Sequence, residues 1–235
     1  MLAIFKRELR SYFTSVIGYV FLVLYLAAGG AVFCFTTLFS MSADVTPFFL
    51  YMLIFSSVAL PLLTMKSFSE ERKIKTEQLV LTSPVSLVSM VMGKFFAAYV
   101  VFAASMIFNS LYFLFLIPYA VVKAGLLIGN LVAILLVGMV FIAIGLFVSS
   151  LTENQLAAAV GTIAIILGFL LIGVLGSLIP TSYWIRYVFD FISIFMRFQG
   201  FTNGYFDIAS IVYYLSMAFI FLYLTVRVYD RRRYN

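Results

Sequence analysis

Six long apolar segments, almost free of charged residues, set the strongest constraint on how this chain can fold. They lie at about 16–39, 48–65, 95–117, 125–150, 155–178 and 209–229. Each approaches or exceeds the ~20 residues that a helix needs to cross a hydrocarbon core about 30 Å thick. The polar residues of 149–155 divide the fourth segment from the fifth, because the apolar stretch around them is too long for a single span. The pattern therefore predicts six membrane-spanning helices.

The composition supports the same fold class. Of the 235 residues, 65% are hydrophobic and only 10% are charged, whereas soluble domains average about 25% charged residues. One water-soluble core could not bury so much apolar surface. Backbone polar groups inside a bilayer must be satisfied within the chain, which favours helices for spans of this length. We expect a single all-α polytopic transmembrane domain over residues 1–235.

The basic residues indicate the orientation. Twelve of the 15 fall at the N-terminus, between spans two and three, or at the C-terminus: Lys6, Arg7, Arg10, Lys66, Arg72, Lys73, Lys75, Lys94, Arg227, Arg231, Arg232 and Arg233. The remaining three are Lys123, Arg186 and Arg197. Because cytoplasmic segments carry the excess of Lys and Arg, both termini are predicted to be cytoplasmic. The net charge of +6 then matches anionic lipid headgroups rather than nucleic acid.

The N-terminal segment, residues 1–15, mixes Lys6, Arg7 and Arg10 with apolar side chains. This mixture favours a short amphipathic helix that lies in the membrane interface before the first span. A basic flank that only sets orientation is an alternative, and it is compatible with the first. The apolar run that follows is too long for a cleavable signal peptide.

Several chemistries are excluded by residue type. The chain has no histidine and one cysteine, Cys34, so the usual zinc sites and Ser-His-Asp or Cys-His catalysis are excluded. Asn109 and Asn130 are the clearest polar groups within the spans, and proton pathways generally need buried ionisable residues there. The sequence argues against a proton-coupled transporter or an intramembrane enzyme. Our hypothesis is an apolar conduit that suits a lipid-linked or amphipathic cargo.

The longest cytoplasmic segment, residues 66–94, carries a second helix signal. Ser67 followed by Glu70 fits a capping box, and Glu71–Lys75 and Lys73–Glu77 are i,i+4 pairs of opposite charge. Pro84 disfavours helical geometry before it. The pattern predicts a short charged helix parallel to the membrane. It would either contact another protein or remain a solvated loop helix.

The stretch from Phe68 to Ser86, FSEERKIKTEQLVLTSPVS, resembles the cytoplasmic signature of ABC type-2 transporter permeases. The matching positions are Glu71, Arg72, Thr76, Gln78, Leu79, Leu81, Thr82 and Pro84, whereas Lys75 stands where many members have glycine and Gln78 where many have glutamate. The turn at 149–155 resembles the turn after that family's fourth span. Residues 197–207 and 213–216 resemble the approach to the last span in permeases of the gliding-motility ABC transporter type.

The resemblance implies a permease subunit of an ATP-driven exporter in a bacterial inner membrane, paired with a second permease, identical or different. It implies a cytoplasmic coupling helix that contacts a separate ABC ATPase, and an interfacial helix beside that ATPase formed by residues 1–15. The expected coupling residues are Ser69, Glu70, Glu71, Arg72, Lys73, Lys75, Thr76 and Glu77. The chain has no GxxxxGK[ST] loop, so ATP and Mg²⁺ would be bound by the partner and this chain would hold no cofactor. A non-transporting component of an ATPase-driven motility or envelope machine is the alternative.

Two further features concern packing. The predicted outer loop, about 179–208, is rich in aromatic residues that include Trp184, Phe189 and Phe195. It favours short re-entrant or interfacial helices, or an aromatic belt that anchors the helix ends. The fifth span places small residues on one face, where close helix packing within the chain or at a subunit interface would occur. These residues are Ala157, Gly161, Ala164 and Gly168.

Overall fold

The computed structural model describes residues 1–75, 86–116, 118, 123–178, 192–202, 204 and 207–234, with the backbone alone at 17, 174–178 and 234. Six helices in this part of the chain are long and apolar enough to span a membrane, which confirms the predicted fold class. They cover Gly18–Leu38, Thr46–Lys73, Leu87–Leu116, Ala124–Leu151, Gln155–Gly173 and Ile208–Arg233. The predictions on Thr76, Glu77, Trp184 and Phe189 fall outside the described residues.

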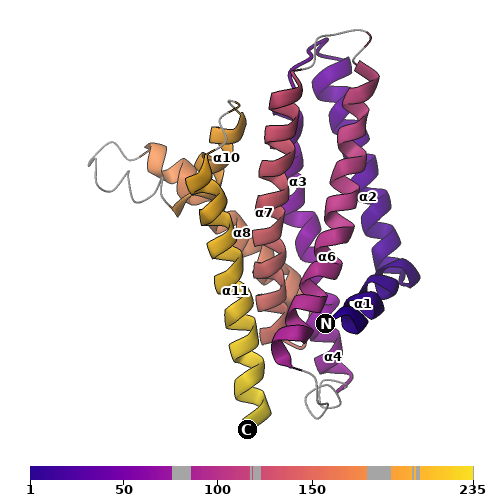
Figure 1. Cartoon of the computed structure of the whole chain (residues 1–235), viewed down its shortest axis with the longest axis vertical. Coiled ribbons are helices and arrows are strands. Elements are labelled where there is room, and N and C mark those ends of the chain that lie inside the picture. The colour runs from indigo at the N-terminus through magenta and orange to yellow at the C-terminus, as the bar shows by residue number, and fades with distance from the viewer. Residues whose placement is uncertain are drawn as a thin grey trace.

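The helices are labelled in chain order. Their bounds are α1 Leu2–Thr14, α2 Val16–Phe33, α3 Thr46–Thr64, α4 Lys66–Lys73, α6 Leu87–Ser110, α7 Ala124–Leu151, α8 Gln155–Leu178, α10 Ile194–Thr202 and α11 Ile208–Tyr234. A π-helical turn at Cys34–Leu38 extends α2, and a 3₁₀ turn at Leu111–Leu116 extends α6. Both chain ends lie in the lower part of the bundle in Figure 1, as an even number of spans requires.

Helix α7 forms the centre of the bundle. It packs against α3, α4, α6, α8, α10 and α11 (Figure 1). About 67% of its apolar window is buried, against 28% for α8 and for α11. Glycines allow this close packing, because a Cβ at Gly138 would lie 2.0 Å from the Phe102 ring and one at Gly145 would lie 2.1 Å from Thr64 Oγ1. Small residues on α7 therefore bring α3 and α6 close to the central helix.

The predicted stripe on α8 has a different position. Ala157, Ala164 and Gly168 are exposed, and a Cβ at Gly168 would meet nothing within 4 Å. Only Gly161 borders a neighbour, with Val148 3.3 Å from its Cβ position. Packing within the chain is therefore the wrong interpretation for the three exposed residues, because this face of α8 points out of the bundle. A role at a subunit interface stays a prediction.

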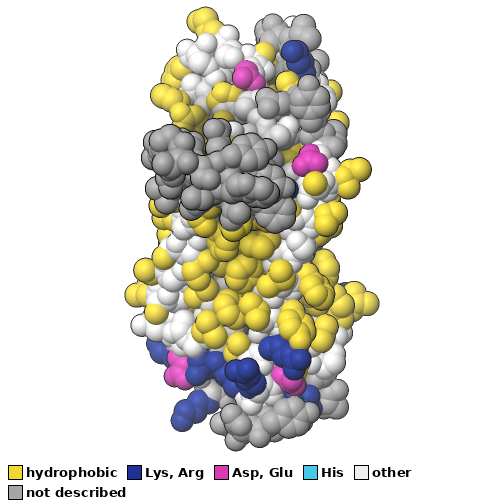
Figure 2. Space-filling model, turned by 90° about the vertical axis from the view of Figure 1, so that its left-hand side faces the viewer, with side chains coloured by type: hydrophobic (Ala, Val, Ile, Leu, Met, Phe, Trp, Pro, Cys, Tyr) yellow, Lys and Arg dark blue, Asp and Glu magenta, His cyan; other side chains and the backbone are white. Residues whose placement is uncertain are grey.

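The charged and apolar side chains are segregated along the bundle. Figure 2 shows hydrophobic side chains across the middle of one face and a group of Lys and Arg side chains below them. The lower end includes α4 and the C-terminal turn of α11 with Arg231, Arg232 and Arg233 (Figure 1). The distribution of basic residues predicts that this end is cytoplasmic, and we refer to it as the inner end.

Candidate functional site: the inner end around α4

Helix α4 continues α3 instead of starting anew. Met65 between them keeps helical dihedrals (φ −55°, ψ −33°), and Thr46–Lys73 forms one 28-residue apolar-to-charged helix. The predicted capping box is wrong, since Met65 occupies the N-cap position and no side chain of its own caps α4. Ser67 instead lies in the first turn, and its hydroxyl is 3.4 Å from that of Tyr12 in α1.

A serine far along the chain supplies the missing cap. The Ser149 hydroxyl accepts hydrogen bonds from the backbone N–H groups of Phe68 and Ser69, both at 3.1 Å, and donates one to Met65 O at 3.0 Å. Amide groups in the first turn of a helix lack partners within that helix. Ser149 is fully buried near the end of α7, so it ties the α3–α4 junction to the central helix.

Lys94 provides a second contact that holds α4 against the bundle. Helix α6 begins at Leu87 rather than at 95, so Lys94 lies two turns inside the helix, with only 2% of its side chain exposed. Its Nζ lies 2.8 Å from Glu71 Oε1, 2.5 Å from Ser67 O and 3.6 Å from Glu8 Oε1. A buried ammonium group is stable only when it is paired and hydrogen-bonded, as it is here. The ammonium group thus joins α1, α4 and α6.

Arg7 and Tyr12 extend this contact along α1. The Arg7 guanidinium is 2.8 Å from Glu8 and 3.4 Å from Glu71. The hydrogen bond with Glu8 raises the pKa of Arg7, and both carboxylates add to that effect. Burial of its hydroxyl raises the pKa of Tyr12 to about 12, against a lowering by the Ser67 hydroxyl. Both side chains therefore keep their usual protonation state at neutral pH.

The other side of α4 contacts the α7–α8 turn and α11. Arg72 donates to Leu151 O at 2.9 Å and lies 3.1 Å from Glu153. The Phe68 ring packs on Tyr229, with ring centroids 4.9 Å apart, and carries Lys94 Nζ 4.9 Å above its own centroid. Arg232 lies over the Tyr229 ring and donates to Ser150 O at 2.7 Å. We call these contacting residues the α4 cluster: Glu8, Phe68, Glu71, Arg72, Lys94, Ser149, Tyr229 and Arg232.

The predicted coupling residues divide into two groups. Ser69, Glu71 and Arg72 turn toward the bundle, so the expected Glu71–Lys75 pair is wrong: Glu71 pairs with Lys94, and the helix ends at Lys73. Glu70, Lys73 and Lys75 remain on the surface, and Glu70 is 3.5 Å from Lys66. Lys75 has a φ of +58°, the left-handed conformation that favours glycine after a helix. This is the position at which the family pattern has glycine.

The sequence-based predictions did not include Glu8, Lys94, Ser149 and Arg232 among the site residues. Two signals were available. Glu8 is the one acidic residue of the basic segment 1–15, and Lys94 interrupts an apolar run. No local signal could identify Ser149 or Arg232, because their partners lie about 80 residues away in the sequence.

The outer end of the bundle has less charge. The nine-residue helix α10 packs against α7 and α8 with Ile194, Phe198 and Phe201 buried, and Phe195 is partly exposed. The Tyr214 hydroxyl donates to Ile194 O at 2.9 Å, and Arg197 lies 4.4 Å above the Tyr213 ring. Because its buried residues face α7 and α8, α10 is held in the bundle more firmly than an aromatic anchor alone would require.

Six spanning helices with a charged, cross-braced inner end define the class of multi-pass α-helical membrane proteins. A family model for the ABC-2 family transporter protein matches residues 35–229. The chain therefore belongs to the ABC-2 transporter family and is a permease, a membrane transport component. No curated protein matches the sequence.

Proposed function

We propose that this chain is the permease subunit of an ATP-driven exporter in a bacterial inner membrane, and that a separate ABC ATPase acts on it through α4. The observation that carries the proposal is the α4 cluster. Helix α4 contacts α1 through Arg7 and Tyr12, α6 through Lys94, α7 through Ser149 and α11 through Tyr229. A displacement of α4 would therefore reach four other helices without passing through a flexible loop.

The surface offered to the ATPase is the outer side of α4, by which we mean the side that faces away from the bundle at the inner end. Glu70 and Lys73 lie there with Ile74, whose side chain is 61% exposed. The inward side is occupied by Glu71 and Arg72, which already have partners within the chain. Docking and transmission are thus assigned to opposite sides of one short helix, with ATP and Mg²⁺ bound by the partner.

Charge reversal on the outer side tests this assignment. The double variant Glu70→Lys/Lys73→Glu keeps the net charge and should abolish co-purification of a co-expressed partner ABC ATPase. The matched control is Arg227→Glu/Asp230→Lys, which reverses an exposed pair on α11 that lies 3.6 Å apart. Retained binding in the α4 variant, with a normal melting temperature, would show that the ATPase docks elsewhere.

Export is tested by reconstitution with that ATPase. ATP-dependent movement of an amphipathic fluorescent lipid across proteoliposomes, in the direction away from the ATPase side, is the expected result. Most buried hydroxyls in the spans bond to their own helix, as Ser105 does to Val101 O and Thr162 to Ala158 O. Because these hydroxyls are not available to line a polar path, an amphipathic cargo is favoured. ATP hydrolysis without movement of any cargo would favour the alternative, an ATPase-driven motility or envelope component.

A second permease subunit would pack on the outward face of α8. Exposed Ala164 and Gly168 would allow a helix from another copy to approach closely. The single Cys34 can be replaced by serine, after which Gly168→Cys should cross-link between copies under mild oxidation. The control Val212→Cys places the thiol on α11, at a side chain 58% exposed. Equal cross-linking of the two variants would contradict a specific interface, and none in either would favour a different chain as the second permease.

A further inference from the structure

Helix α1 has one side against the bundle and one side away from it. Tyr12 contacts α4, Glu8 contacts Lys94 of α6, and Ile4 approaches α6 so closely that a Cβ at Gly93 would lie 3.0 Å from it. Leu2, Lys6, Arg10 and Phe13 are spaced to lie on the opposite face. All four are exposed, with Leu2 at 74% and Phe13 at 47%.

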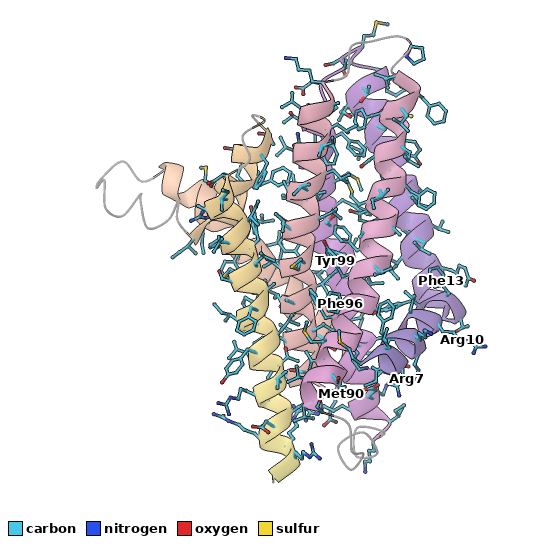
Figure 3. All side chains as sticks on the ribbon, in the orientation of Figure 1. Arg7, Arg10, Phe13, Met90, Phe96 and Tyr99 are labelled. Carbon is cyan, nitrogen blue, oxygen red and sulfur yellow. The ribbon has the colours of Figure 1, made fainter. Side chains whose placement is uncertain are left out.

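The cations on this outer face have no partners among the described residues. Arg7 is paired with Glu8 and Glu71, but neither Lys6 nor Arg10 makes an ion pair with any residue that the structure describes. The one acidic residue of α1, Glu8, is turned toward Lys94 and has only 16% of its side chain exposed. Figure 3 shows Arg10 pointing away from the bundle on the far side of α1. The charged side chains on this outer face of α1, Lys6 and Arg10, are therefore both positive.

The apolar residues beside these cations continue into the membrane-facing side of α2. Phe13 is followed by exposed Val16, Tyr19, Val20 and Val23. Exposed apolar side chains next to exposed cations match a bilayer interface, where acyl chains meet charged headgroups. A protein partner would have to cover the apolar strip and the cations together while α2 remained in the lipid.

We propose that the outer face of α1 is a binding surface for anionic phospholipid headgroups, with Lys6 and Arg10 contacting the phosphates and Leu2 and Phe13 inserted among the acyl chains. This surface is separate from the ATPase-facing side of α4. It would set the depth of α1 in the interface, and α1 is the helix whose Glu8 contacts Lys94. Anionic lipid content would thereby bias the position of the α4 cluster.

A single tryptophan reporter tests the lipid preference without any ATPase, so the result is independent of the proposed coupling. In the full-length chain, Trp184→Phe removes the one native tryptophan and Phe13→Trp introduces the reporter. The protein is reconstituted in phosphatidylcholine vesicles that contain one-tenth brominated phosphatidylglycerol or one-tenth brominated phosphatidylcholine. Quenching by the anionic lipid should be stronger, and it should weaken at high salt.

Charge removal identifies the residues responsible. Lys6→Gln/Arg10→Gln should lower the preference for phosphatidylglycerol by roughly fivefold for each cation removed. Lys73→Gln/Lys75→Gln removes the same charge from α4 and should leave the preference unchanged. Equal quenching by the two lipids, or an equal loss in the α4 variant, would overturn the proposal. Loss of ATPase co-purification in the α1 variant without any lipid preference would assign the face to the protein partner instead.

Discussion

The two ends of the bundle are fastened by different kinds of contact. At the inner end, a side chain on one helix bonds to the backbone of another about 80 residues away, as Ser149 does to Phe68 and Arg232 to Ser150. At the outer end, Asp207 accepts from the N–H of Ser210 and so caps its own helix, and Ser193 Oγ accepts a hydrogen bond from the N–H of Met196, three residues further on. The inner end is therefore tied together by bonds between distant parts of the chain, whereas the outer end combines local caps with bonds between segments about 20 residues apart, such as that from Tyr214 to Ile194 O.

This difference suits the proposed direction of force. A motor that moves α4 needs an inner end that responds as one body. An outer end that opens and closes needs pieces that can separate without leaving buried polar groups unpaired, since such groups are costly in a bilayer. We therefore expect the contacts at the inner end to be strongly coupled to one another and those at the outer end to be more independent.

The largest effect is expected at Lys94. Lys94→Met removes the buried ammonium group that Glu71 and Glu8 share. Breaking one side of a buried ion pair costs about 3–5 kcal/mol. The melting temperature in detergent should fall steeply. Lys66→Met, which removes an exposed i,i+4 partner of Glu70, should cost no more than about 0.5 kcal/mol. Similar melting temperatures for the two variants would mean that the inner end is not cross-braced by charge.

Lys94 also shows where sequence reasoning succeeded and where it could not. The six spans and the basic end follow from composition and local patterns, and the family follows from the resemblance that begins at 68–86. The six spanning helices and the family match agree with them. The partner of a charge depends on how helices are rotated against one another, which a local pattern does not encode. The i,i+4 rule paired Glu71 with Lys75, but the helix ends at Lys73, so Glu71 is free to turn toward Lys94.

The same limit explains the error at the start of α4. Ser67 and Glu70 have the right spacing for a capping box, but Met65, not Ser67, occupies the N-cap position of α4. The real cap, Ser149, lies 80 residues further along the chain. The stripe on α8 was detected correctly as a face of small residues. Local spacing could not show that this face points outward, because that depends on the position of α7.

The next largest loss of stability is expected from a change in core packing in the middle of the bundle, between its two ends. Gly138→Leu would force a side chain into the space of Phe102, whose ring atom Cε1 lies 2.0 Å from the Cβ position. Overpacking a filled core costs about 1–3 kcal/mol. Gly168→Leu on α8 meets nothing within 4 Å and should leave the melting temperature of the single chain unchanged. A larger fall in melting temperature for Gly168→Leu would indicate that a second subunit already covers this face of α8.

Removal of the cap at Ser149 should have a smaller and more local effect. Ser149→Ala leaves the buried amides of Phe68 and Ser69 without the oxygen that they share, at an expected cost of about 1–2 kcal/mol. Hydrogen exchange should increase at residues 66–70 and not at α10. Ser150→Ala is the control, because its hydroxyl bonds within α7, to Phe147 O. Unchanged exchange at α4 would show that this contact does not hold the junction.

The smallest effect is expected at the locally capped outer end. Asp207 accepts hydrogen bonds from the N–H groups of Ala209 and Ser210 and from the Ser210 hydroxyl, at 2.6–3.1 Å. The Ser210 hydroxyl is the main cause of its lowered pKa, with the two amides and Arg197 adding to it. Asp207→Ala should cost about 1 kcal/mol, whereas Asp207→Asn, an equally good cap, should cost little at neutral pH.

The pH dependence separates the charge of Asp207 from its capping geometry. Because folding lowers the pKa of this carboxyl, the stability that its ionised form adds is fully present above the unfolded value of about 3.9 and is lost as the pH falls through the lower folded value. The difference in melting temperature between wild type and Asp207→Asn should therefore shrink between pH 5 and pH 2. Since Asp207 is exposed, that change should be small and should leave hydrogen exchange at α4 unaffected. A pH-dependent loosening of α4 that follows Asp207 would show that the outer end is coupled to the inner end, against the independence inferred from its local contacts.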